Sequence, residues 1–278
     1  MPSRARAVEV IDAGLVTVGG APASAASRQV SAGEVVVVAA APARFVSRGG
    51  EKLDAALDAW AIDVRGRRVL DAGASTGGFT DCLRQRGAAP VIAVDVGHGQ
   101  LAWSLRTDPG VVVLERTNLR HLETLHGGPA EIAVADLSFI SLRTVAPALL
   151  RLTVPAAAFA LLVKPQFEAG RGRVGRGGIV RDPAVHRAVL GEVVDGLGAA
   201  GLVVTDVIRS PLTGADGNVE FLARAMRAGP RVRDARLDAV VGDGEDVREA
   251  PARGEPGHEG QSGAGAARPV GPRAKGAS

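Results

Sequence analysis

Residues 69–81 read VLDAGASTGGFTD, an apolar run that passes into small residues and then into a helical pattern. Such a run is typical of a buried strand that ends in a glycine-rich turn before a helix. Glycines let a ligand lie against the backbone there, and the amides at the start of the helix attract polar groups. The stretch therefore predicts an open α/β sheet with a ligand site beyond the carboxyl end of its first strand.

Apolar strands alternate with helix-length segments around this stretch. We expect a helix over 48–62 before it and another over 183–200 near the end of the domain. Strands separated by helices indicate a seven-stranded, mostly parallel, Rossmann-like sheet that is covered on both faces. The last two strands are joined by a short Pro/Gly/Asn loop, which predicts an antiparallel hairpin at the sheet edge. The predicted strands are 68–71, 91–95, 111–114, 132–136, 157–163, 202–209 and 218–225.

Four segments follow from pattern and composition. Residues 1–43 form a small αβ unit, which is hard to stabilise alone, and 44–47 form a linker. Residues 48–227 form the α/β domain. Residues 228–278 are rich in Gly, Pro, Ala and Arg with little apolar periodicity, so we expect a disordered tail. The strands expected in the first segment are 16–18 and 34–40.

Composition argues against several classes of protein. The chain has 278 residues, 46% of them apolar, but its longest unbroken apolar stretch, 35–41, is too short to span a bilayer. No basic-then-apolar signal segment opens the chain, which predicts a cytoplasmic protein. One cysteine, Cys82, and five scattered histidines offer no metal-ligand cluster. With 3% aromatic residues, a stacking platform for single-stranded nucleic acid would be thin.

Two acidic residues mark the predicted ligand site. Asp71 precedes the first glycine of the turn, and Asp95 ends the second strand, where a carboxylate can accept hydrogen bonds from a ribose diol. Dinucleotide sites use G-x-G-x-x-G to bring a pyrophosphate onto helix amides, but here the third glycine is displaced. Asp71 suits a cationic amino-acid moiety better than a pyrophosphate. S-adenosylmethionine is therefore the better match, with NAD as the alternative.

Lysine is scarce in this chain, with three among 33 basic residues and a net charge of +3. Lys164 follows the fifth predicted strand, at the same sheet edge as Asp136, while Lys52 and Glu220 come from elements that flank this edge. A lysine with its free pKa of about 10.4 is a poor base. Beside a second cation and partly desolvated, its amine can approach neutrality. Together these residues predict a site that deprotonates a hydroxyl.

Two other methyl acceptors fit the sequence poorly. Methylation at a pyrimidine C5 needs a cysteine nucleophile, but Cys82 lies in the helix after the glycine-rich turn. Exocyclic amines commonly meet a Pro-Pro-aromatic turn, whereas residues 136–139 read DLSF. A hydroxyl acceptor fits best.

A set of motifs closely resembles the TlyA family, haemolysin-like ribosomal RNA 2′-O-methyltransferases with an FtsJ-type catalytic fold. The resemblance covers residues 3–226. It implies a class I methyltransferase sheet, S-adenosylmethionine as the cofactor, ribosomal RNA as the partner and the 2′-hydroxyl of cytidine as the acceptor. The motifs are RGGEKLDAAL (48–57), LDAGASTGGFTD (70–81), DVGHGQLAWSLR (95–106), LERTN (114–118), ADLSFISL (135–142), LVKPQFE (162–168) and GNVEF (217–221).

The family's Lys-Asp-Lys-Glu catalytic set falls, by motif, on Lys52, Asp136, Lys164 and Glu220. Lys164 is expected to act as the base or to orient the hydroxyl. The alternatives are an NAD-dependent oxidoreductase and a haemolysin-like RNA-binding protein without catalysis. The residues expected to bind the cofactor are Asp71, Gly73, Ser75, Gly77, Gly78, Phe79, Asp95, Asn118 and Asp136.

The first segment resembles the second part of a ribosomal-protein-S-four-like RNA-binding domain, without the additional basic helix with which family members usually begin. Residues 44–47 match the interdomain linker, with Phe45 where a tryptophan is common. A Gly/Arg loop at 170–178 is a further candidate for contact with RNA phosphates.

Overall fold

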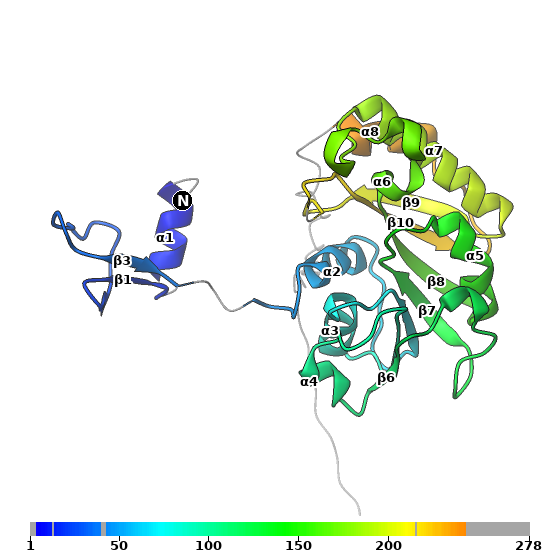
Figure 1. The fold of residues 1–278 in the computed structure, drawn as a ribbon, viewed down its shortest axis with the longest axis horizontal. Helices are drawn as coiled ribbons and strands as arrows, with labels where there is room; N and C mark the ends of the chain where they lie inside the picture. Colours follow the sequence, from blue (N-terminus) through cyan, green and yellow to red (C-terminus); the bar gives the residue numbers. More distant parts are fainter. Residues whose placement is uncertain (1–3, 13, 40–42, 215, 243–278) are drawn as a thin grey trace, which may run out of the picture. The chain divides into compact units, whose positions relative to one another are not determined.

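The computed structural model describes residues 4–12, 14–39, 43–214 and 216–242, and its α/β domain is a seven-stranded sheet between two layers of helices (Figure 1). The strands are β4 Val69–Ala72, β5 Val91–Val94, β6 Val111–Leu114, β7 Ala130–Ala135, β8 Thr153–Val163, β9 Val203–Arg209 and β10 Phe221–Met226. Their order in the sheet is β6-β5-β4-β7-β8-β10-β9. Strands β4 to β8 run parallel, and β10 runs antiparallel to both of its neighbours.

Helices cover both faces of this sheet. Successive side chains of a strand point to opposite faces. The helices are α2 Gly49–Ala59, α3 Gly78–Gln85, α4 Trp103–Arg106, α5 Leu142–Arg151, α6 Pro165–Glu168, α7 Pro183–Ala199 and α8 Asp234–Gly242, with short 3-10 turns η1 Leu119–His121, η2 Arg171–Arg173 and η3 Arg176–Gly178. Because of the alternation, Leu162 of β8 packs in the core with α2 and α3, whereas Leu161 packs with α5, α7 and α8. Within the described ranges no helix is long and apolar enough to cross a membrane.

The predicted fold class is confirmed, and so is the antiparallel hairpin at the sheet edge. Within the hairpin, β10 inserts between β8 and β9, so that β9 forms the edge. Leu222 and Ala223 of β10 are buried, whereas Thr205 and Asp206 of β9 are half-buried. The more apolar strand takes the inner place because it is covered on both faces.

The predicted tail begins too early at residue 228. Val232, Leu237 and Val240 are buried in the same core as α5 and α7. Leu237 and Val240 lie on one face of α8, and this short apolar stripe was hidden by the composition of the segment as a whole. The fold thus continues to Gly242, and the rest of the predicted tail lies outside the described residues.

The N-terminal unit consists of α1 Arg4–Asp12 and a three-stranded sheet of order β2-β1-β3. Its strands are β1 Val16–Val18, β2 Ala21–Pro22 and β3 Val36–Val38. Val10, Val16, Val18 and Ala23 form its small core. The strand expected over 34–40 is shorter because its pairing with β1 covers residues 36–38, and residue 40 lies outside the described part.

The predicted linker lies against the α/β domain. Phe45 is buried against Gly50 of α2, where a Cβ atom would overlap the phenyl ring. The backbone amide of Val46 donates to Asp81 Oδ2 at 2.8 Å, and Arg44 forms an ion pair with Asp54. The segment that leads into α2 is therefore held by α2 and α3.

Candidate active site

The predicted site residues lie at one edge of the sheet because of the strand register. Ala72 pairs with Ala135, so the residues after them, Gly73 and Asp136, lie side by side. Phe221 pairs with Val163. Because β10 is antiparallel, its first residue lies beside the last residue of β8, which brings Glu220 next to Lys164. Lys52 reaches the same edge from α2.

A cleft of about 270 Å³, called here the lysine cleft, is lined by all four predicted catalytic residues. Lys52 Nζ lies 2.5 Å from Glu220 Oε2, and these side chains are 9% and 3% exposed. Lys164 Nζ lies 2.5 Å from Asp136 Oδ1, and these side chains are 13% and 24% exposed. The structure thus brings the four residues together as two lysine–carboxylate pairs.

This pairing differs from the expected arrangement of the lysines. We expected a lysine amine beside a second cation, but each amine faces a carboxylate. A nearly buried amine without a counter-charge would be costly, and the carboxylate offsets part of that cost. The four residues therefore form a fixed array of charges that can hold and orient a hydroxyl group.

A second cleft of about 420 Å³, called here the cofactor cleft, shares Gly73, Ser75 and Asp136 with the lysine cleft. It is also lined by Asp95 and Asn118. Gly73 has φ +88°, and a Cβ atom there would meet the main-chain oxygen of Asp136. A glycine is therefore required where the two clefts meet.

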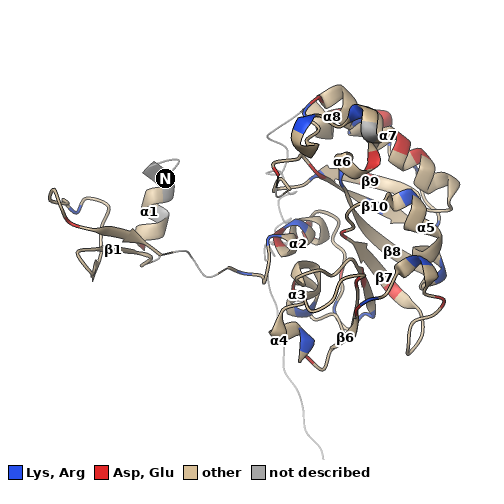
Figure 2. Cartoon of the chain, in the orientation of Figure 1, with Lys and Arg blue, Asp and Glu red and all other residues tan. Residues whose placement is uncertain are grey.

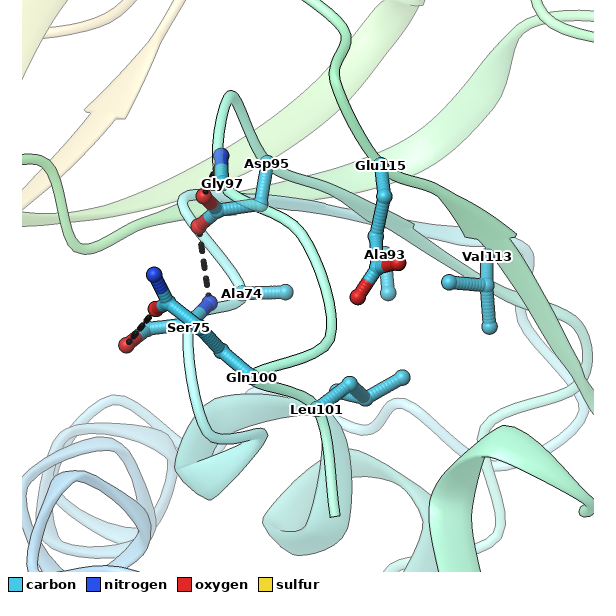
Figure 3. Close-up of a pocket in the computed structure, with 9 residues that line it drawn as sticks. All are labelled: Ala74, Ser75, Ala93, Asp95, Gly97, Gln100, Leu101, Val113 and Glu115. Atoms are coloured by element: carbon cyan, nitrogen blue, oxygen red, sulfur yellow. Dashed lines mark hydrogen bonds between the residues drawn. The ribbon is translucent and has the colours of Figure 1, made fainter. Parts of the chain in front are cut away.

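Asp95 joins two loops at the wall of the cofactor cleft. Its Oδ2 accepts a hydrogen bond from the Ser75 amide at 2.8 Å (Figure 3), and its Oδ1 accepts one from the Gly97 amide at 2.6 Å. Ser75 has φ +47°, and its hydroxyl donates to Gln100 Oε1 at 3.3 Å. Each oxygen of Asp95 keeps a further lone pair, as the acceptor of a ribose diol needs.

Asp71 lies beneath the glycine-rich turn and lines neither cleft. It is fully buried, and the Thr80 hydroxyl donates to its Oδ2 at 2.6 Å. Its Oδ1 has no hydrogen-bond partner in the described part of the chain. Burial raises the pKa of Asp71 to about 7; the hydrogen bond from Thr80 works against this, and the Asp136 carboxylate adds to it. Direct contact of Asp71 with a ligand, as predicted, finds no support in this geometry.

The other predicted cofactor residues divide between the two clefts. Gly77 also lines neither cleft, because it packs under Leu101 and Leu105. Gly78 and Phe79 line the lysine cleft, next to Ser47 at the end of the linker. The residues that line at least one cleft are Gly73, Ser75, Gly78, Phe79, Asp95, Asn118 and Asp136.

Three residues at these clefts were missed by the sequence analysis. Phe139 is 90% exposed with φ +64°, an uncommon backbone conformation for an aromatic residue, and its ring lies 4.9 Å from that of Phe167. The Ser138 hydroxyl accepts a hydrogen bond from Lys164 Nζ at 3.2 Å. Arg48 is exposed at the lysine cleft. The sequence offered one signal for the first two: they lie two and three residues after Asp136, an acidic residue at a strand end.

In the part of the chain that the structure describes, basic residues do not gather in one stripe. Lys and Arg are scattered over the elements and interleaved with Asp and Glu (Figure 2). In the Gly/Arg loop, Arg173 is paired with Glu192 at 2.6 Å, while Arg176 is exposed. The Asn218 side chain joins this loop to the start of β10 through the Val180 amide and the Gly178 carbonyl.

Comparison with known proteins agrees with this arrangement. The sequence profile of the FtsJ-like methyltransferases matches residues 45–227. The 16S/23S rRNA (cytidine-2′-O)-methyltransferase TlyA of Mycobacterium tuberculosis is 52% identical over 222 residues, 79% of this chain and 82% of that protein. Hemolysin A of Brachyspira hyodysenteriae is 38% identical over 223 residues, 80% of this chain and 92% of that protein. A solved structure described as a candidate hemolysin, from Streptococcus thermophilus, has a TM-score of 0.70 at 38% identity and covers 87% of this chain and 90% of that one. The chain therefore belongs to the FtsJ-like methyltransferase family, within its TlyA branch.

Proposed function

We propose that the protein transfers a methyl group from S-adenosylmethionine to the 2′-hydroxyl of cytidine in ribosomal RNA. The observation that carries this proposal is the Lys164–Asp136 pair at the junction of the two clefts. A hydroxyl held in the lysine cleft would meet a group held in the cofactor cleft at this junction. The activity named for the relative from M. tuberculosis supports the choice of acceptor.

The residues of the cofactor cleft fit S-adenosylmethionine. Gly73 lets a ligand lie against the backbone, and Asp95 offers acceptors for a ribose diol. Asn118 Oδ1 accepts a hydrogen bond from the Arg120 amide, so the side-chain NH2 group of Asn118 is left to donate to a ligand. The carboxylates of Asp95 and Asp136 favour a positively charged ligand. When bound, S-adenosylmethionine supplies an electrophilic methyl group. Membership of a methyltransferase family favours this cofactor over NAD.

The chain's own residues act mainly by alignment. Lys164 hydrogen-bonds the 2′-hydroxyl and either orients it or takes its proton as the oxygen attacks. Asp136 holds Lys164, while Lys52 and Glu220 position the ribose. Holding the two reactants in line supplies most of the rate gain in such a transfer.

Two residues at the rim support an RNA substrate. Arg48 has an exposed guanidinium beside the lysine cleft, where a backbone phosphate next to the target ribose would lie. Phe139 offers an exposed ring on which an unstacked base can pack, as in single-stranded RNA recognition. We further propose that residues 1–43 form an RNA-binding domain, on the strength of their likeness to ribosomal-protein-S-four-like domains.

The decisive experiment incubates the purified chain with tritium-labelled S-adenosylmethionine and ribosomal subunits, and maps 2′-O-methyl positions. With the wild-type protein we expect the tritium label on the 2′-oxygen of cytidine ribose. Lys164→Ala should lose transfer while binding the cofactor with nearly wild-type affinity in calorimetry. Lys275→Ala, which removes the tail lysine, is the matched control and should stay active. Label on a base, or retained turnover in Lys164→Ala, would refute the proposal.

A further inference from the structure

We infer that Ser138 is a positioning residue that, together with Asp136, sets the orientation of the Lys164 amine. This inference rests on the proposed function, in which Lys164 meets the substrate hydroxyl. Ser138 and Asp136 both follow β7, and Lys164 directly follows the neighbouring strand β8. The amine lies 2.5 Å from Asp136 Oδ1 and 3.2 Å from Ser138 Oγ.

The number of groups around the amine makes this contact informative. A neutral amine has two N–H donors and one lone pair, and an ammonium has three N–H donors. Asp136 Oδ1 is an ion-pair partner that makes no hydrogen bond with a described residue, so Ser138 Oγ is the acceptor that holds one of the tetrahedral positions around Nζ. The other two positions carry the remaining N–H groups, or an N–H group and the lone pair. With one position held by Ser138, rotation about the Cε–Nζ bond is fixed and the other two positions point in set directions.

Without Ser138, the Lys164 amine would have no hydrogen-bond acceptor among the described residues and could turn about the Cε–Nζ bond beside Asp136. Lys52 differs, because its hydrogen bond goes to its own ion-pair partner, Glu220. The lysine that meets the hydroxyl is thus oriented by a neighbouring hydroxyl group and not by its carboxylate partner alone.

Ser138 has no competing structural task. Its side chain is exposed, and its hydroxyl makes no other hydrogen bond within the described ranges. Removing the hydroxyl should leave the fold intact. The exposed position also leaves room for the additional methyl group of threonine or valine.

The kinetic test compares Ser138→Ala, Ser138→Val and Ser138→Thr. Threonine keeps the hydroxyl, and valine has the same shape without it. We expect kcat to fall about tenfold in the Ala and Val variants, the size of one hydrogen bond to a charged group, and to be largely restored by Thr. KM for the cofactor and the melting temperature should stay unchanged in all three. Equal rates for the Val and Thr variants would overturn the inference.

A second measurement tests the contact independently of turnover. The chain has three lysines, so selective carbon-13 labelling of lysine gives a spectrum with few side-chain signals. Ser138→Ala and Ser138→Val should move the Cε signal of Lys164 and leave that of Lys52 in place, whereas Ser138→Thr should keep both. An unmoved Lys164 signal would overturn the inference. A wild type that transfers no methyl group would refute the proposed function, while this spectrum would still decide the role of Ser138.

Discussion

Lys52 Nζ and Glu220 Oε2 lie 2.5 Å apart, although 168 positions separate the two residues in the sequence. The pair joins α2 to the start of β10 and is nearly buried. Breaking a buried pair from one side leaves an uncompensated charge, which costs about 3 kcal/mol or more. Replacing both partners by apolar groups avoids that cost.

We therefore expect Lys52→Met and Glu220→Gln each to lower the free energy of unfolding by about 3 kcal/mol. The double variant Lys52→Met/Glu220→Leu should recover most of this loss without regaining methyl transfer. Urea unfolding measures the first effect and the tritium assay the second. Arg173→Met, which breaks the more exposed pair with Glu192, is the control and should cost less than about 1 kcal/mol. An active double variant would contradict the role given to the pair.

Gly73→Ala should weaken cofactor binding as well as the fold. At φ +88° an alanine is strained, and its Cβ would also meet the Asp136 carbonyl oxygen at the junction of the clefts. Gly66→Ala is the matched control, since Gly66 has φ +69° with open space around it. Gly66→Ala should lose about 1 kcal/mol of stability from backbone strain, and Gly73→Ala should lose more because its Cβ also meets a main-chain atom. In calorimetry Gly73→Ala should bind S-adenosylmethionine at least tenfold more weakly, and Gly66→Ala should bind it normally. Equal affinities would argue against a backbone contact at Gly73.

Phe139→Ala should weaken RNA binding by about tenfold, because stacking of one base on an aromatic ring contributes about 1–3 kcal/mol. Fluorescence anisotropy with a labelled ribosomal RNA fragment measures this affinity. Trp103→Ala is the control: Trp103 is exposed but lines neither cleft, so its loss should change little. A fall in affinity for S-adenosylmethionine with unchanged RNA binding would instead assign Phe139 to the cofactor.

Asp71 should make stability depend on pH. Burial raises its pKa from 3.8 to about 7, so the folded protein keeps this proton to a higher pH than the unfolded chain does. The contribution of this bound proton to the free energy of unfolding is therefore fully present below about pH 4, and it is lost as the pH rises to about 7. Between pH 5 and pH 8, wild type should lose about 3 kcal/mol more than Asp71→Asn, which cannot titrate.

Urea unfolding of wild type and Asp71→Asn at both pH values tests this expectation. The variant keeps an oxygen to accept the Thr80 hydroxyl, so the comparison isolates the charge. Parallel pH curves for the two proteins would show that Asp71 does not titrate in this range.

The sheet was predictable because its strands are short apolar runs bounded by turn residues, as Val111–Leu114 shows by matching its predicted range. The inner position of β10 could not be predicted, since it depends on which of the two hairpin strands is covered on both faces. Helix α8 could not be predicted either, because its buried face consists of few apolar residues.

In the site, the strand ends were predictable and the contacts between side chains were not. Asp136 and Lys164 follow strands that the apolar pattern marks clearly. Their pairing, and that of Lys52 with Glu220, depends on register between distant segments. The position of the Asp71 side chain could have been predicted from the sequence. Asp71 alternates with Leu70 along the strand and lies on the same face as Val69, which packs in the core with α2 and α3. That alternation places its carboxylate under α3, away from both clefts.

The order of the site along the chain has a consequence for how the protein is made. Along the chain, the last residue that lines the cofactor cleft is Val145, whereas the last residue that lines the lysine cleft is Glu220. During synthesis the residues that line the cofactor cleft are therefore all present before the last residue of the lysine cleft is made. A chain that stops before Glu220 leaves Lys52 without its ion-pair partner and β8 without its neighbour β10. The lysine cleft is therefore complete only in the finished domain.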